Sequence, residues 1–171
     1  MSTSTELLQR VNAVEQRLAT RAALPVNPAV LTGADPSTGE QWDAGQVWAH
    51  LAEFIPYWIE QARLVAAAGL DEPVEFGRTR TDPSRVAAIA RDRRQPLSVL
   101  WSETHADIEW LRRFLESVDE SAWMARGLHP TLGIMTLERL VDEFLVGHLE
   151  EHAEQLDALA AGGAAPAIVE P

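Results

Sequence analysis

The sequence contains no cysteine and no lysine, and these two absences limit the chemistry that the chain can perform by itself. Without cysteine it has no disulfides, no thiolate metal ligands and no cysteine nucleophile. All 14 basic residues are arginines, so Schiff-base chemistry and a lysine general base are excluded as well. The chain therefore has neither a thiol nor an amine nucleophile of its own.

Long apolar runs and clustered positive charge are also missing. No run approaches the roughly 18 apolar residues of a membrane-spanning helix, and the N-terminal stretch MSTSTELLQR lacks the pattern of a signal peptide. The formal net charge of -12 argues against partners such as nucleic acid and anionic membrane surfaces, which require clustered cations. We therefore expect a protein of the cytoplasm that acts on small molecules.

Helical periodicity dominates what is present, and 171 residues suffice for one domain. Helices are predicted from about Thr5 to Ala23, from Asp43 to Gly69, from Asp82 to Val118 with a bend at Pro96, and from Thr136 to Gly162. Asp43 with Gln46 resembles a capping box, and Asp82 before Pro83 is a helix start signal. These features predict an all-α fold, a four-helix bundle over residues 1–162, with a long crossover connection after the first helix. Residues 163–171 are expected to form a flexible C-terminal tail.

Three histidines fall on the apolar faces of two predicted helices. His148 and His152 lie one turn apart on the inward face of the last helix, and His50 lies between Val47 and Phe54 in the second. Such histidines are either hydrogen-bonded core residues or metal ligands. The i, i+4 spacing is the one that helical metal sites use, and one divalent ion would satisfy three buried imidazoles together. Three imidazole ligands would leave a coordination position open for chemistry.

Two further histidines have weaker claims to this site. His105 lies beside the buried stripe of the third helix, four residues after Trp101, from where it could approach the site. His129 precedes Pro130 in a predicted loop and is expected at the surface or in loop packing.

Three stretches in this order resemble the DinB-like superfamily of metal-binding four-helix bundles. They are QWDAGQVWAHLAEF (41–54), GLHPTLGIMTLERLV (127–141) and GHLEEHAEQL (147–156). The resemblance implies metal ligands at His50, His148 and His152, a divalent ion such as zinc or nickel as the cofactor, and a homodimer. Several members use a low-molecular-weight thiol, among them mycothiol-dependent maleylpyruvate isomerase and the bacillithiol or mycothiol S-transferases. The isomerase branch replaces one histidine of the HxxxH pair by glutamate. This sequence keeps both, and so looks closer to the general or S-transferase branch.

The leading hypothesis is a metal-dependent transferase that uses an external thiol of the mycothiol or bacillithiol type. The metal would bind the thiol and lower its pKa, so that the thiolate is present at neutral pH. We expect the electrophilic substrate in an adjoining cavity. Arg126, near the last loop, is either a solvated surface arginine, which is the commoner role, or a contact for a carboxylate of the thiol cofactor. Trp48, Tyr57, Trp101 and Trp123 either line this cavity or are ordinary core residues, which is the commoner role of aromatic residues at helical spacing.

Two alternatives remain open from the sequence. A metal-dependent hydrolase would use the same histidines to activate water, but it needs a general base, and Glu143, Glu151 and Glu154 are poorly placed. A non-catalytic bundle would bind metal or ligand and dimerise, with Trp42 or Trp110 at its interface.

Overall fold

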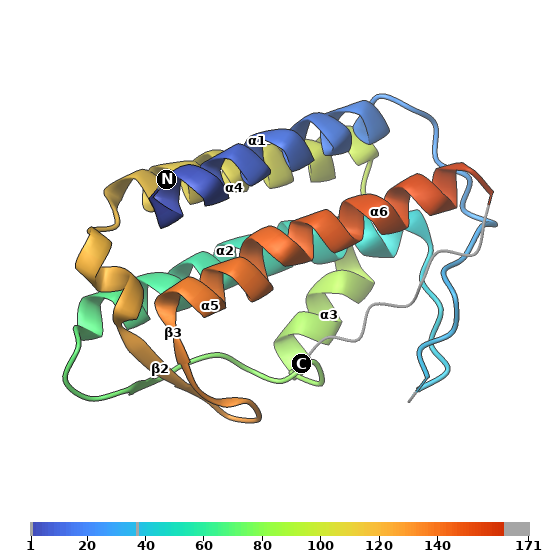
Figure 1. The fold of residues 1–171 in the computed structure, drawn as a ribbon. Helices are drawn as coiled ribbons and strands as arrows, with labels where there is room; N and C mark the ends of the chain where they lie inside the picture. Colours follow the sequence, from blue (N-terminus) through green and yellow to red (C-terminus); the bar gives the residue numbers. More distant parts are fainter. Residues whose placement is uncertain (1, 37, 163–171) are drawn as a thin grey trace.

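The computed structural model describes residues 2–36 and 38–162, which form a mostly helical fold with one small sheet (Figure 1). The helices are α1 (Thr3–Ala22), α2 (Ala44–Ala68), α3 (Pro83–Asp92), α4 (Leu97–Ser117), the 3-10 helix η1 (Glu120–Met124), α5 (Leu137–Val141), the π-helical turn η2 (Asp142–Gly147) and α6 (His148–Ala160). The strands are β1 (Val74–Glu75), β2 (Arg126–His129) and β3 (Gly133–Thr136). The predicted tail at 163–171 lies outside the described residues.

Side-chain caps set the starts of the helices where the sequence predicts them. Asp43 and Gln46 form a reciprocal capping box at the start of α2. Asp82 accepts hydrogen bonds from the backbone N–H groups of Ser84 and Arg85, and Pro83 occupies the first turn of α3. These two caps fix where the chain turns into the helices that carry His50 and Arg85.

The long helices pack along one another around a continuous apolar core (Figure 1). Helices α1 and α2 both pack against α4 and both pack against α6. The segment 23–43 joins α1 to α2, so this long connection links two helices that share neighbours. Fully buried leucines and isoleucines such as Leu18, Leu51 and Ile108 fill the space between the helices, and burial of such side chains is the main stabilising term.

Three details differ from the sequence-based prediction. The predicted third helix is two helices, α3 and α4, because Pro96 interrupts the hydrogen-bond ladder and caps the start of α4. The fold is also not wholly helical, since the segments predicted as loops contain a sheet of order β1-β2-β3. Strand β1 pairs parallel with β2, and β2 pairs antiparallel with β3. Strands of two to four residues are too short for a periodic signal.

The predicted last helix also contains a π-helical turn that its sequence pattern does not reveal. This turn, η2, ends at Gly147, directly before His148. A Cβ atom at Gly147 would lie 2.9 Å from the carbonyl oxygen of Asp142, closer than real side chains approach. Glycine therefore provides the space that this turn needs, and π-turns are frequent at functional sites.

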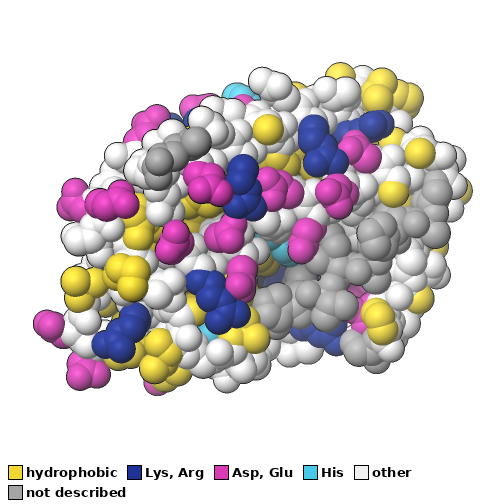
Figure 2. Space-filling model, viewed as in Figure 1, with side chains coloured by type: hydrophobic (Ala, Val, Ile, Leu, Met, Phe, Trp, Pro, Cys, Tyr) yellow, Lys and Arg dark blue, Asp and Glu magenta, His cyan; other side chains and the backbone are white. Residues whose placement is uncertain are grey.

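Charged side chains cover the face formed by α1 and the last helices, where acidic groups and arginines alternate (Figure 2). Arg10 of α1 forms ion pairs with Asp142 and with Glu150, at 2.5 and 2.7 Å. Arg17 and Arg21 both pair with Asp157. These pairs join α1 to both sides of the π-turn. No helix within the described residues is long and apolar enough to cross a membrane.

Candidate metal centre

His50, His148 and His152 come together in the core, although His50 is 98 residues away from His148 in the chain. The Nε2 atom of His148 lies 2.8 Å from Nε2 of His50 and 2.9 Å from Nε2 of His152. All three side chains are buried, with exposed fractions of 0%, 5% and 1%. The structure thus unites the three histidines that the sequence selects, with the same ring nitrogen of each pointing to a common centre.

Protonation chemistry makes this arrangement a good metal site. The Nε2 atom of His148 faces two other ring nitrogens, and a neutral imidazole nitrogen is either a donor or an acceptor. That nitrogen has either one proton or one in-plane lone pair, so it forms a well-directed hydrogen bond with only one of the two rings. Three lone pairs directed at one divalent cation resolve the conflict. Zn–N distances of about 2.0–2.1 Å place tetrahedral ligand atoms roughly 3.3 Å apart, so a small opening of the cluster accommodates the ion.

Gln155 orients one of these histidines. Its side-chain oxygen Oε1 lies 2.9 Å from Nδ1 of His152, and Gln155 is itself 3% exposed. An amide oxygen only accepts, so Nδ1 of His152 carries the proton and Nε2 keeps its lone pair for the cluster. The stretch HxxxHxxQ therefore contains two ligand candidates and the group that sets the tautomer of the second.

Aromatic side chains hold the imidazole rings in place. The ring of Phe54 stacks on His148 with a centroid distance of 3.9 Å and an interplanar angle of 19°. Phe54 also contacts His50 edge-on at 4.8 Å, and Trp42 contacts His50 edge-on at 5.3 Å. These contacts leave the rings little freedom to turn, which reduces the entropy lost when a metal binds.

A cavity of about 440 Å³ adjoins the cluster, and His152 and Gln155 form part of its wall. This volume lies within the range of small-molecule sites. The opposite wall comes from α3 and from the segments before α2 and α3, and it includes Thr32, Trp42 and Arg85. A ligand in the cavity would therefore lie directly against a histidine of the cluster.

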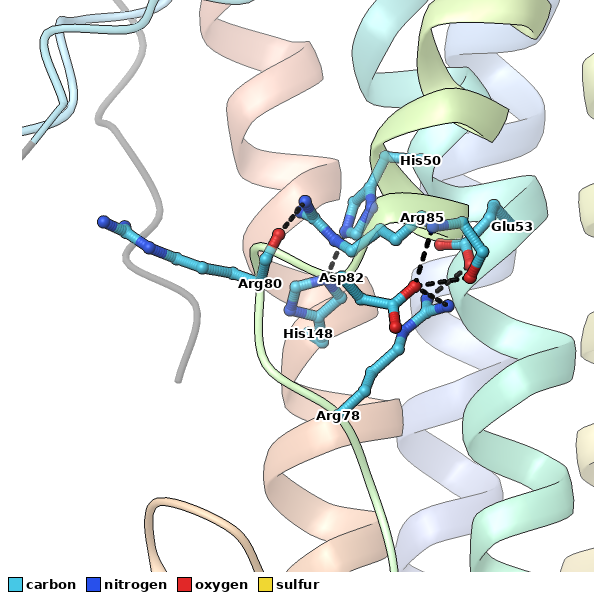
Figure 3. A network of polar contacts seen from close by, with 8 residues as sticks. His50, Glu53, Arg78, Arg80, Asp82, Arg85 and His148 are labelled. Atoms are coloured by element: carbon cyan, nitrogen blue, oxygen red, sulfur yellow. Dashed lines mark hydrogen bonds and ion pairs between the residues drawn. The ribbon is translucent and has the colours of Figure 1, made fainter.

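A buried polar network places Arg85 beside the histidines (Figure 3). Arg78 forms an ion pair with Glu53 of α2, and lies 3.9 Å from Asp82, the cap of α3. A hydrogen bond from the Ser84 hydroxyl, together with the backbone N–H of Arg85, lowers the pKa of Asp82. Arg85 donates from Nη1 to the carbonyl oxygen of Arg80 at 2.9 Å. The ionic network thus fixes the first turn of α3 next to His50 and His148.

The other two histidines lie elsewhere. His105 is half-exposed on α4, with Nε2 3.3 Å from Oε1 of Glu15, so it does not approach the cluster. His129 is buried in β2 and its ring stacks on Trp58. Its Nδ1 accepts from the backbone N–H of Thr131 and faces the hydroxyl of the same residue. His129 is thus a buried strand residue, and its predicted place in a loop is wrong. Burial lowers the pKa of His129.

The four aromatic residues considered for the cavity wall belong to other parts of the fold, so the core reading holds for them and the lining reading does not. None of the four faces the cavity beside His152: Trp48, Tyr57, Trp101 and Trp123. Trp48 and Trp123 are core residues, and Tyr57 lies under the guanidinium of Arg78. Arg126 instead donates to the carbonyl oxygen of Asp71 at the surface.

Sequence reasoning missed the arginines of the cavity. Arg80 and Arg85 lie around the helix start at Asp82, and Arg93 follows the end of α3. Trp42, predicted for an interface, lines the cavity, and Trp110 is partly buried against the core. The cap at Asp82 was the one feature of the sequence that could have indicated Arg85, because it fixes the position of Arg85 in the first turn of α3.

The fold and the site together are those of long packed helices with a buried group of three histidines, one on α2 and two on α6. Among solved structures, a mycothiol-dependent maleylpyruvate isomerase matches with a TM-score of 0.66 at 15% identity, over 90% of this chain and 62% of that one. A variant of such an enzyme, with one histidine changed to alanine, matches with a TM-score of 0.64 at 13% identity, over 97% and 65%.

At these identities the likeness shows a shared fold. This chain spans less than two-thirds of the length of both neighbours. No protein-family model matches the sequence, and a comparison with curated proteins found no match.

Proposed function

We propose that this chain is a DinB-like four-helix bundle that binds one divalent metal ion, zinc or nickel, through His50, His148 and His152. The observation that carries the proposal is the convergence of three buried Nε2 atoms, 2.8 and 2.9 Å apart, beside a small-molecule cavity. Three neutral imidazoles leave at least one coordination position for a further ligand, as catalytic sites do.

We infer further that the ion activates a low-molecular-weight thiol of the mycothiol or bacillithiol type for transfer to a small electrophile. When bound, a divalent ion lowers the pKa of a thiol and keeps the thiolate present at neutral pH. The absence of cysteine and lysine fits a reaction whose nucleophile comes from outside the chain. The names of both structural neighbours include dependence on mycothiol, which supports the choice of thiol.

Residues of the chain have distinct parts in this proposal. Gln155 holds the proton of His152 at Nδ1 and thereby directs Nε2 to the ion. Phe54 holds the ring of His148 nearly parallel to its own and covers one side of the site. The cavity at His152 holds the electrophile beside the ion.

The test is conjugation of monochlorobimane to mycothiol or bacillithiol by metal-loaded protein, measured as the increase in bimane fluorescence. We expect a rate that depends on bound zinc or nickel and that disappears in the double variant His148→Ala/His152→Ala. His105→Ala is the matched control, because His105 lies outside the cluster, and it should retain the rate. Fully metal-loaded protein that gives only the uncatalysed rate would contradict the transferase, and would leave the hydrolytic and non-catalytic alternatives.

We also expect a homodimer in the cytoplasm, as the resemblance and the composition imply. Light scattering on the purified protein measures its molecular mass and therefore shows directly whether it is a homodimer.

A further inference from the structure

Helix α3 forms part of the cavity wall, but few apolar contacts anchor it to the rest of the fold. Only two of its ten residues are buried, Arg85 and Ile89, whereas α4 buries six residues of its own. Helix α3 packs chiefly against α2, and Figure 1 shows it outside the group of long helices. A segment with few buried apolar contacts opens at a lower free energy than the core beside it.

Ion pairs hold α3 at both of its ends. Before the helix begins, Arg80 pairs with Asp35 at 3.2 Å, and after it ends, Arg93 pairs with Asp43 at 2.5 Å. Both carboxylates belong to the segment before α2, so the two pairs tie the ends of α3 to the same stretch of chain. All four side chains are partly exposed. Salt therefore weakens these pairs, and each contributes modestly to the stability of the closed arrangement.

The end of α3 also lies close against the start of α2, at Gly45. A Cβ atom at Gly45 would overlap the backbone carbonyl oxygen of Arg93. Alanine at this position would favour helix α2 by itself, because alanine has a higher helix propensity than glycine. The same substitution would push the end of α3 away from α2. Glycine at position 45 is thus what allows α3 to close.

We propose that α3 is a cover over the cavity, which opens when the ion pairs at its ends separate and so admits small molecules to the histidine cluster. The cavity wall opposite His152 includes Val86, Ile89 and Ala90 of this helix. Displacement of α3 removes that wall, whereas α2 and α6 keep the histidines in place. The opening needs no bound metal, and only its use for entry of a substrate rests on the proposed function.

The first experiment is hydrogen exchange of metal-free protein, followed by mass spectrometry of peptides from α3 and α4 at low and at high salt. The double variant Arg80→Met/Arg93→Met removes both ion pairs, and Gly45→Ala pushes the end of α3 outward. Arg63→Met is the matched control, because Arg63 forms an exposed pair with Glu60 on α2.

We expect amides of α3 in the unaltered protein to exchange about tenfold or more faster than those of α4. High salt should accelerate exchange in α3 by about twofold to fivefold, and the double variant by about fivefold or more. Gly45→Ala should accelerate it as well, although this change favours α2. Exchange in α4 should not respond, and Arg63→Met should change neither helix. Equal exchange of α3 and α4, or exchange in α3 that responds to neither salt nor the variants, would overturn the proposal.

The second experiment tests whether α3 controls access to the histidines, and it uses the absence of cysteine from the chain. In Asp35→Cys/Arg80→Cys, a short bifunctional maleimide joins the two thiols and replaces the ion pair by a covalent link. The same variant capped with N-ethylmaleimide is the control. The measured quantity is the rate at which diethylpyrocarbonate modifies His152, which lines the cavity and is 1% exposed. His105 is half-exposed on α4 and serves as the internal standard.

We expect the link to slow modification of His152 by about tenfold or more relative to the capped variant, because modification then requires wider unfolding. Modification of His105 should be the same in both. Equal rates at His152 would contradict the role of α3 as a cover. Both experiments use metal-free protein, so they give the same answer if the protein fails to bind zinc. That failure would contradict the proposed metal centre alone.

Discussion

Gln155 Oε1 lies 2.9 Å from Nδ1 of His152, and this contact determines which nitrogen of the imidazole faces the other two histidines. We predict that Gln155→Leu lowers the affinity for zinc by about tenfold to a hundredfold, because the ring then loses the partner that fixes its tautomer and orientation. Gln155→Glu keeps an acceptor and should retain most of the affinity. Competition with a chromophoric chelator measures both.

The control for this pair is Gln16→Leu, since Gln16 is exposed on α1. It should bind zinc as the unaltered protein does. Unchanged zinc affinity in Gln155→Leu would mean that packing alone orients His152.

The second prediction concerns Gly147, the last residue of the π-turn before His148. Gly147→Ala places a Cβ atom 2.9 Å from the Asp142 carbonyl oxygen, so the turn must shift. Alanine favours a helix over glycine by up to about 1 kcal/mol, but the clash with backbone opposes this gain and displaces His148. We expect a lower melting temperature together with weaker zinc binding, measured by calorimetry and chelator competition. A variant that is more stable and binds zinc normally would show that the π-turn is not required.

Removing Arg78 should destabilise the fold. Its side chain is 10% exposed and that of its partner Glu53 is 14% exposed, so Arg78→Met leaves a carboxylate largely buried beside the Asp82 cap. Loss of one partner from a buried pair costs about 3–5 kcal/mol, and the partial exposure here reduces this to about 2–4 kcal/mol. Urea unfolding measures it. The control is Arg139→Met, which breaks an exposed pair with Glu143 and should change little. Equal effects of the two variants would contradict the structural role of the network.

Asp107 predicts a dependence of stability on pH. Burial, with the neighbouring charge of Glu103, raises its pKa to about 6. The folded protein then binds more protons than the unfolded chain between pH 4 and pH 6, so the contribution of Asp107 to stability falls as the pH rises through this window. Asparagine has nearly the shape of the aspartate side chain and, like its protonated form, carries no charge. Asp107→Asn should therefore be more stable by about 1–2 kcal/mol at pH 7, allowing for partial exposure, and nearly unchanged at pH 4.

Glu116→Gln is the control for this prediction, because Glu116 is exposed on the same helix. It should show little difference between the two pH values. A gain from Asp107→Asn that is as large at pH 4 as at pH 7 would assign the effect to packing instead of ionisation.

The sequence predicted the parts of the fold that depend on local chemistry. The caps at Asp43 and Asp82 appear as expected, and so does the inward face of the last helix, including His148 and His152. These follow from hydrogen-bond donors at helix starts and from the spacing of apolar residues, both of which are visible in short windows.

The missed features depend on contacts between distant segments. Strand β1 has two residues, and its pairing with Gly127 and Leu128 of β2 leaves no periodic trace in the sequence. The π-turn depends on the space at Gly147, which a helical pattern does not distinguish from an ordinary glycine. The placement of Arg85 against the histidines requires the packing of α3 on α2. Spacing therefore pointed to three histidines that the structure brings together, and it gave no indication of the residues that form the walls around them.

The most direct test of the account is metal analysis of protein purified without chelator and then incubated with zinc or nickel. The unaltered protein and His105→Ala should each hold about one divalent ion per chain, because three imidazoles converge in the core and His105 lies outside them. The double variant His148→Ala/His152→Ala should hold none. Absence of metal from the unaltered protein, or equal metal in the double variant, would contradict a three-histidine metal centre and the chemistry proposed for it.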